Sequence, residues 1–130
     1  MKTRYVGLAV LLVIGIGCNK TTPVPVGGKG GNATIIVSPT HRGIYVDSCT
    51  VYLKYNATDA PTGNYDDSQK VYLVDTTPVA IFAQLKKGQY YIFGDGYHLP
   101  FNTWVKGGIP IVITAEDSNF VLLPTSPYIK

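Results

Sequence analysis

The side chains best placed to do chemistry belong to one segment, residues 95–108 (DGYHLPFNTWVKGG). Tyr97, Phe101 and the only tryptophan, Trp104, lie close together there, and His98 lies between them. A loop of fourteen residues is longer than most hairpin loops, and loops of such length are often functional. Aromatic faces beside polar groups could stack on sugar rings or hold an extended peptide. The alternative, which we favour, is that Trp104 and Phe101 cover the open end of the fold.

The two histidines, His41 and His98, are far apart in the sequence and lack metal-ligand spacing. A zinc site needs three or four convergent ligands, so we expect ordinary exposed loop histidines and no metal. If successive strands alternate in direction, segment 95–108 shares an end of the molecule with residues 39–48, which contain His41. The candidate ligand-binding residues are therefore Tyr97, Phe101, Trp104, His98 and His41.

Cys49 invites comparison with a catalytic nucleophile. It alternates with apolar residues along 49–56 (CTVYLKYN), so we expect it to be buried as a small hydrophobic side chain. A nucleophilic thiol needs a lowered pKa and a nearby base, and no such signature surrounds it.

The acidic residues Asp59, Asp66 and Asp67 lie in a polar loop, 57–69. They lack the spacing of a calcium-binding loop, and we expect a solvated loop. The sequence offers no catalytic dyad, triad or metal set, so we expect a non-enzymatic protein without a cofactor.

The N-terminal residues indicate where the protein resides. Lys2 and Arg4 precede an apolar run over residues 6–17, and Cys18 follows directly. Twelve apolar residues are too few to cross a bilayer, which needs roughly 20 in a helix, and the arrangement is typical of a secretion signal. A cysteine at the cleavage point resembles the lipobox of bacterial lipoproteins. The resemblance implies a signal peptide over 1–17, acyl chains on Cys18, and attachment to membrane lipid. We expect the protein at the periplasmic face of the outer membrane, and the alternative is the cell surface.

The composition favours one folded domain that does not bind nucleic acid. The formal net charge is only +3, and the charges are dispersed, whereas nucleic-acid binding needs a clustered basic face. Apolar residues make up 45% of the chain, which contains ten tyrosines, so global disorder is excluded.

The distribution of glycine and proline divides the chain. After Cys18, residues up to 32 are rich in both and predict a flexible linker over 18–32. From residue 33 short β-like runs alternate with turn residues. We expect seven strands, over 33–38, 49–56, 70–75, 78–83, 89–94, 109–114 and 119–123. Such spacing predicts an all-β domain over 33–130, a single antiparallel seven-stranded β-sandwich of immunoglobulin-like size.

Two tight turns are expected within this domain. Thr76-Thr77 would close one hairpin, and residues 85–88 would close another, with Gly88 free to take a positive φ.

The run 82–92 has the form F-x-x-L-x-x-G-x-Y-x-I. It resembles the signature of transthyretin-like, carboxypeptidase-regulatory-like sandwich domains. The resemblance implies that Phe82 and Leu85 seal the core, Gly88 turns the corner, and Tyr90 enters the next strand. Over about residues 27–114 the chain is similar to small lipoproteins of Bacteroidetes-type bacteria, in its GGKGGNA, DSCTVYLKYNA and VKGGIP segments. The family implies a fold and a location but no activity.

The outward face of strand 49–56 carries Tyr52 and Lys54. Tyrosine is common on pleated surfaces and at interfaces, so a docking face is the alternative to plain cross-strand packing. We expect a binding or accessory module whose partner is an envelope protein or a glycan.

Overall fold

Two β-sheets form nearly all of the structure, a computed structural model that describes residues 25–130. The first sheet contains β1 (Lys29–His41), β2 (Ile44–Tyr45), β5 (Tyr72–Val74), β6 (Thr77–Leu85) and β9 (Ser118–Pro124). The second contains β3 (Ser48–Tyr55), β4 (Asp67–Lys70), β7 (Gly88–His98), β8 (Thr103–Ile113) and β10 (Ser126–Tyr128). A single 3-10 turn, η1 (Leu99–Phe101), joins β7 to β8. The all-β prediction is confirmed.

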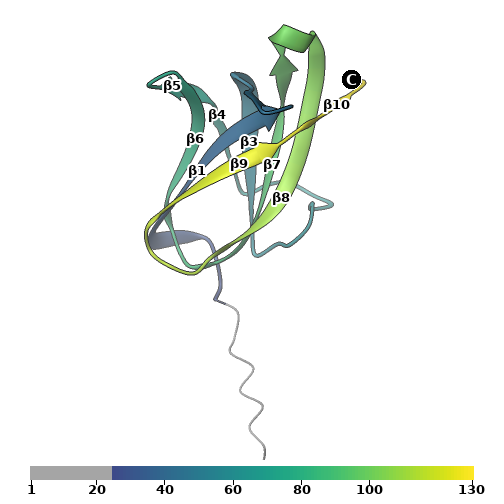
Figure 1. The fold of residues 1–130 in the computed structure, drawn as a ribbon. Coiled ribbons are helices and arrows are strands. Elements are labelled where there is room, and N and C mark those ends of the chain that lie inside the picture. Colours follow the sequence, from purple (N-terminus) through teal and green to yellow (C-terminus); the bar gives the residue numbers. More distant parts are fainter. Residues whose placement is uncertain (1–24) are drawn as a thin grey trace, which may run out of the picture.

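The pairing of the strands is antiparallel with one exception. In the second sheet the order is β10-β8-β7-β3-β4, and all neighbours are antiparallel. In the first sheet β1 pairs antiparallel with β2 and β6 but parallel with β9. β1 therefore lies between β6 and β9, although both strands come much later in the sequence (Figure 1).

Strands that pass from one sheet to the other close both sides of this sandwich-like arrangement. β4 pairs with β3, and one residue later β5 pairs with β6 in the opposite sheet. Val71 lies at this crossing, where its N–H donates to the Cys49 carbonyl. At the other side β9 passes into β10 at Thr125, whose N–H donates to the Thr40 carbonyl. The prediction of one strand over 70–75 is wrong, because the chain changes sheets within it.

Six of the seven predicted runs each fall on one strand and the run 70–75 covers parts of two, whereas the described residues form ten strands. The additional ones are short: β2, β10, and a separate β4 before β5. β8 begins six residues earlier than predicted, and β7 ends four residues later.

The core lies between the sheets and is filled by alternate residues, as period-two patterning requires. Along β3 the buried residues are Cys49, Val51 and Leu53, as predicted, and Tyr55 packs against them. Further core residues include Ile35, Val37, Phe82, Leu85, Tyr90, Ile92, Val105, Ile113 and Leu123.

The turn after β6 is not a hairpin, because β6 and β7 belong to different sheets. Phe82 and Leu85 are buried at its start, and Gly88 has a φ of 153°. The buried Tyr90 hydroxyl donates to the Lys86 carbonyl at 2.6 Å and accepts from the Gly28 N–H at 2.8 Å. These bonds hold the corner between the two sheets.

The hairpin between β5 and β6 is confirmed, but its turn lies one residue earlier than predicted. Val74 pairs with Thr77, so Asp75 and Thr76 are the turn residues. Both have positive φ, 47° and 70°, which two-residue hairpins of this kind require.

The folded part begins before the predicted boundary at Ala33. β1 begins at Lys29, and Gly27 and Gly28 are buried. A Cβ on Gly31 would collide with the Leu85 carbonyl, so the end of the predicted linker belongs to the folded part. The predicted signal peptide and Cys18 lie outside the described residues.

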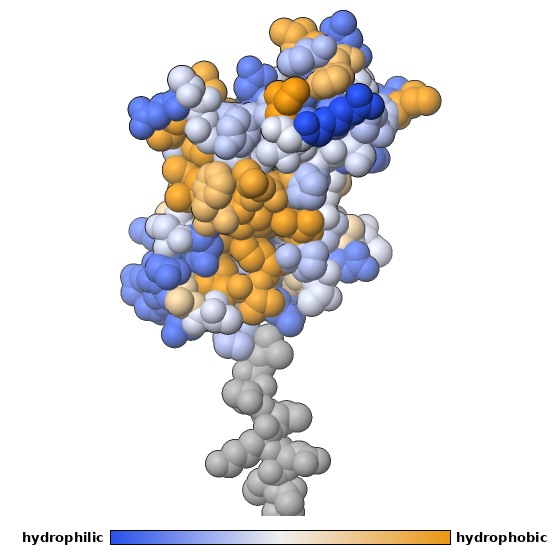
Figure 2. Space-filling view, viewed as in Figure 1, coloured by the Kyte–Doolittle hydropathy of each residue, from blue (hydrophilic) through white to orange (hydrophobic). Residues whose placement is uncertain are grey.

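The outer faces of the two sheets differ in character. Apolar side chains gather over β1, β6 and β9 in the face shown in Figure 2, where Phe120 is 56% and Leu122 is 53% exposed. The outer face of the second sheet is aromatic and polar. Within residues 25–130 no helix is long and apolar enough to span a membrane.

Candidate functional site

Alternation along β7 builds the candidate site. Gly94, Gly96 and His98 point inward and are buried, so Phe93, Asp95 and Tyr97 point outward. The glycines are required on the inner side. A Cβ on Gly94 would lie 2.8 Å from the Leu123 side chain, and one on Gly96 would collide with the Ser48 carbonyl.

Segment 95–108 is therefore not the long loop that we expected. β7 runs to His98 and β8 begins at Thr103, because Gly94 and Gly96 let the end of β7 pack closely against neighbouring strands. Only η1 and Asn102, which has a φ of 46°, form the connection.

Tyr97 and Trp104 lie side by side on the outer face of the second sheet. They are directly opposite in the β7–β8 register, and opposite residues share a face. Their ring centroids are 5.1 Å apart in an edge-to-face arrangement. The Tyr97 hydroxyl also lies 3.4 Å from the Asn102 side-chain oxygen. Trp104 remains 38% exposed.

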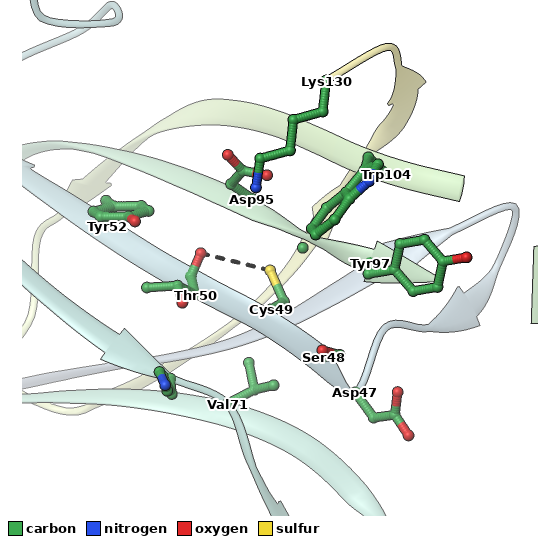
Figure 3. Close-up of a pocket in the computed structure, with 12 residues that line it drawn as sticks. Asp47, Ser48, Cys49, Thr50, Tyr52, Val71, Asp95, Tyr97, Trp104 and Lys130 are labelled. Atoms are coloured by element: carbon green, nitrogen blue, oxygen red, sulfur yellow. Dashed lines mark hydrogen bonds between the residues drawn. The ribbon is translucent and has the colours of Figure 1, made fainter. Parts of the chain in front are cut away.

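A pocket of about 430 Å³ lies next to this pair, and we call it pocket A. Figure 3 shows Tyr52 on one side of it and Tyr97 with Trp104 on the other. The side chains that give the pocket its chemistry are Thr50, Tyr52, Asp95, Tyr97, Trp104 and Lys130. The Lys130 ammonium lies 4.0 Å from the centre of the Trp104 ring, so a cation covers one face of the indole.

Asp95 supplies a carboxylate to pocket A. The Tyr128 hydroxyl of β10 donates a hydrogen bond to it. This bond, followed by burial and the negative charge of Asp95, raises the pKa of Tyr128 to about 12. The Tyr128 ring in turn lies under the Lys106 ammonium at 4.4 Å. The carboxylate on β7 is therefore held in place by β10, on the far side of β8.

Cys49 borders pocket A from the inner side, with 7% of its surface exposed. Burial, then the Asp95 charge, raises the pKa of its thiol to about 12. The thiol is therefore protonated at neutral pH, and thiols in this state are poor nucleophiles. The expectation that Cys49 is buried is confirmed.

The prediction of exposed loop histidines is wrong. His41 ends β1 and His98 ends β7, and both are buried because inward positions of the two sheets meet there. Their Nδ1 atoms lie 2.8 Å apart, so one ring donates and the other accepts. Among the described residues His98 Nε2 has no hydrogen-bond partner.

Phe101 and Trp104 have separate places. Phe101 lies against His41 and His98, with ring centroids 5.2 Å and 5.0 Å away, and the Arg42 guanidinium lies 5.2 Å from its ring. Phe101 thus covers the end of the sandwich, as the lid interpretation expected. Trp104 is not beneath it but faces pocket A, so the structure divides the predicted ligand residues into two groups.

The acidic loop residues have structural partners. Asp66 accepts from the Tyr55 N–H at 2.7 Å and pairs with Lys54 at 3.4 Å. Asp67 pairs with Lys29 at 3.6 Å. No group of three potential metal ligands occurs within residues 25–130.

Sequence reasoning counted Asp95 only among the polar groups of segment 95–108, missed Tyr128, and placed Tyr52 only on a generic outward face. The alternation of Phe93, Asp95 and Tyr97 with glycines in FGDGYH is the signal that could have found this part of the site. Comparisons with protein-family models, curated proteins and solved structures find no match to this chain.

Proposed function

We propose that this chain is a non-enzymatic binding module of the bacterial cell envelope, held at a membrane by lipid on Cys18. It binds its ligand in pocket A. The observation that carries the proposal is that Trp104, Tyr97 and Tyr52 line one pocket together with the Asp95 carboxylate.

Aromatic side chains fit this role because they offer a large contact area at a low cost in side-chain entropy. Binding pockets generally combine such surfaces with a few fixed polar groups. Asp95 and Thr50 are polar groups of this kind, and the hydrogen bond from Tyr128 fixes the first of them. A carbohydrate or a peptide suits these contacts. The raised pKa of Cys49 favours a binding role over nucleophilic catalysis.

Trp104 is the only tryptophan, so its fluorescence reports on pocket A alone. Purified protein is titrated with a panel of oligosaccharides and peptides, and the change in emission is recorded. A ligand that contacts the indole should shift the emission, and Trp104→Ala should weaken its binding, measured by calorimetry, by about tenfold or more, as for buried tryptophans in other interfaces.

Phe120→Ala is the matched control, because Phe120 is an exposed aromatic residue of β9 in the other sheet. It should leave the affinity unchanged. If no member of the panel changes the emission, or if both variants weaken binding equally, pocket A is not the site.

The anchor rests on the N-terminal sequence, where a short apolar run precedes Cys18. Several acyl chains anchor a protein stably, whereas one is marginal. Mass spectrometry of the membrane fraction should find acyl chains on Cys18, and Cys18→Ser should release the protein from that fraction. An unacylated Cys18 in membrane-bound protein would contradict the anchor.

We also propose kinship with transthyretin-like, carboxypeptidase-regulatory-like sandwiches and with Bacteroidetes-type lipoproteins. What supports it is the placement of the motif residues: Phe82 and Leu85 are buried, Gly88 turns between the sheets, and Tyr90 enters β7. An experimental structure that superimposes poorly on that family would refute this kinship without affecting pocket A.

A further inference from the structure

A second aromatic cluster lies on the same outer face as pocket A. Tyr52 of β3 is directly opposite Phe93 of β7, and their ring centroids are 6.2 Å apart. Tyr65, from the loop before β4, folds over both. Its ring lies 5.8 Å from Phe93, nearly parallel at 16°, and 5.4 Å from Tyr52.

A second pocket, of about 610 Å³, adjoins this cluster, and we call it pocket B. Tyr52 and Tyr65 line it together with Asn64 and Ser68. Tyr52 lines both pockets, so the two adjoin at this side chain. Phe93 and Tyr97 are four residues apart on β7, which separates the two aromatic groups by about 13 Å. That span is longer than a ligand with one small ring and suits a chain-like ligand.

Beside pocket A a ligand is recognised by side chains. The lining residues Thr50, Tyr52, Asp95, Tyr97 and Trp104 all lie where their strand is paired on both sides, so their backbone groups are not free for a peptide. Extended peptides commonly bind by adding a strand to an open sheet edge. Here the two pockets combine the aromatic rings of Trp104, Tyr97, Tyr52 and Tyr65 with polar groups such as Asp95 and Asn64. A chain of sugar rings, with apolar faces and hydroxyl edges, matches this combination.

The charges of the strip nearly cancel. In pocket A, Asp47 and Asp95 are balanced by Lys70 and Lys130. In pocket B, Asp66 and Asp67 are paired with Lys54 and Lys29. A polyanion or polycation would gain little here, because a strong charge preference needs an excess of one sign.

We infer that a linear, uncharged oligosaccharide lies across the outer face of β3 and occupies both pockets, with Tyr52 between them. This inference rests on the proposed function of pocket A and names its ligand class. Several stacked sugar rings share the binding energy, so affinity rises with chain length until both pockets are filled.

The test uses ladders of linear neutral gluco- and xylo-oligosaccharides, from the monosaccharide to the hexasaccharide, with the full mature protein. Calorimetry measures affinity for the wild type, Tyr65→Ala and Trp104→Ala. The wild-type affinity should rise along one ladder and then level off. Tyr65→Ala should weaken binding of the hexasaccharide about tenfold, as loss of a contact aromatic commonly does, and should leave the shortest bound sugar unaffected. Trp104→Ala should weaken both.

Tyr65→Phe is the matched control. It keeps the ring and should bind the hexasaccharide as the wild type does, and circular dichroism should show the same fold for all variants. If Trp104→Ala weakens binding but Tyr65→Ala does not, the extended site is refuted and pocket A stands. If Trp104 emission responds to peptides and to no sugar, the ligand class is wrong. If it responds to neither, the proposed function fails as well.

Discussion

Lys130 covers a face of Trp104 that a ligand would use. The ammonium lies 4.0 Å from the ring centroid, and Lys130 is exposed. An exposed cation–π contact is worth about 0.5–1 kcal/mol, and a ligand that stacks on this face must first displace it.

We therefore expect Lys130→Ala to raise the affinity of pocket A by about two- to fivefold, which is that free energy expressed as a ratio. Fluorescence titration of Trp104 measures the change. Lys130→Arg keeps a cation over the ring and should show no gain. A weaker affinity in Lys130→Ala would mean that the ammonium contacts the ligand instead.

The buried histidine pair makes stability depend on pH. Burial, then His98, then Arg42 lower the pKa of His41 below its ordinary value. The unfolded chain therefore takes up protons near pH 6.5, the ordinary histidine pKa, before the folded chain does. Stability is complete above that pH and falls as the pH drops through it.

Urea unfolding should accordingly show a lower midpoint at about pH 5 than at about pH 7.5. A protonated His41 carries a hydrogen on both ring nitrogens, so its Nδ1 could only donate across the 2.8 Å contact to His98. The glutamine of His41→Gln does not titrate in this range, so the urea midpoint of that variant should fall less. An equal fall in wild type and variant would assign the effect to other groups.

Among the elements, the corner between β6 and β7 depends on one hydroxyl. The Tyr90 hydroxyl bonds to Lys86 and Gly28, and without it the buried Gly28 N–H loses its partner. We expect Tyr90→Phe to lower the free energy of unfolding by about 1–3 kcal/mol, measured by urea denaturation. Tyr91→Phe, on the outer face of the same strand, should change it by less than about 0.5 kcal/mol. Equal effects of the two substitutions would show that the Tyr90 hydroxyl stabilises the fold no more than the Tyr91 hydroxyl does.

The strands were largely predictable because their apolar residues alternate. Cys49, Val51 and Leu53 marked the inner face of β3. The end of β7 was not predictable by the same rule, because Gly94 and Gly96 occupy inner positions where an apolar residue would signal a strand. Their role depends on Leu123 and Ser48, which come from other strands. The sequence around Gly94 and Gly96 does not indicate that packing.

The candidate site shows the same limit. Trp104 and Tyr97 stood out by residue type, but their direction depends on strand register. Tyr65 lies in a polar loop, and nothing nearby in the sequence indicates that it stacks on Phe93. The approach of His41 to segment 95–108 was expected from alternating strands, whereas the burial of both histidines depends on how the sheets meet at that end.

For the whole molecule, the position of the first packed residue determines how far the N-terminus can be shortened without a loss of stability. Gly28 accepts from the Lys86 N–H and donates to Tyr90. A chain that begins at Ala33 lacks both bonds and should lose about 2 kcal/mol of stability relative to one that begins at residue 25. Thermal unfolding of the two purified proteins measures this. Equal melting temperatures would mean that residues 25–32 are linker after all.

The position of β1 between β6 and β9 has a mechanical consequence. It spans the domain from Lys29, the end nearest the proposed anchor, to His41, close to the Trp104 end. Tension between a membrane and a captured polymer would act along this strand. β1 could then slide out only by shearing two ladders at once, rather than by unzipping them bond by bond.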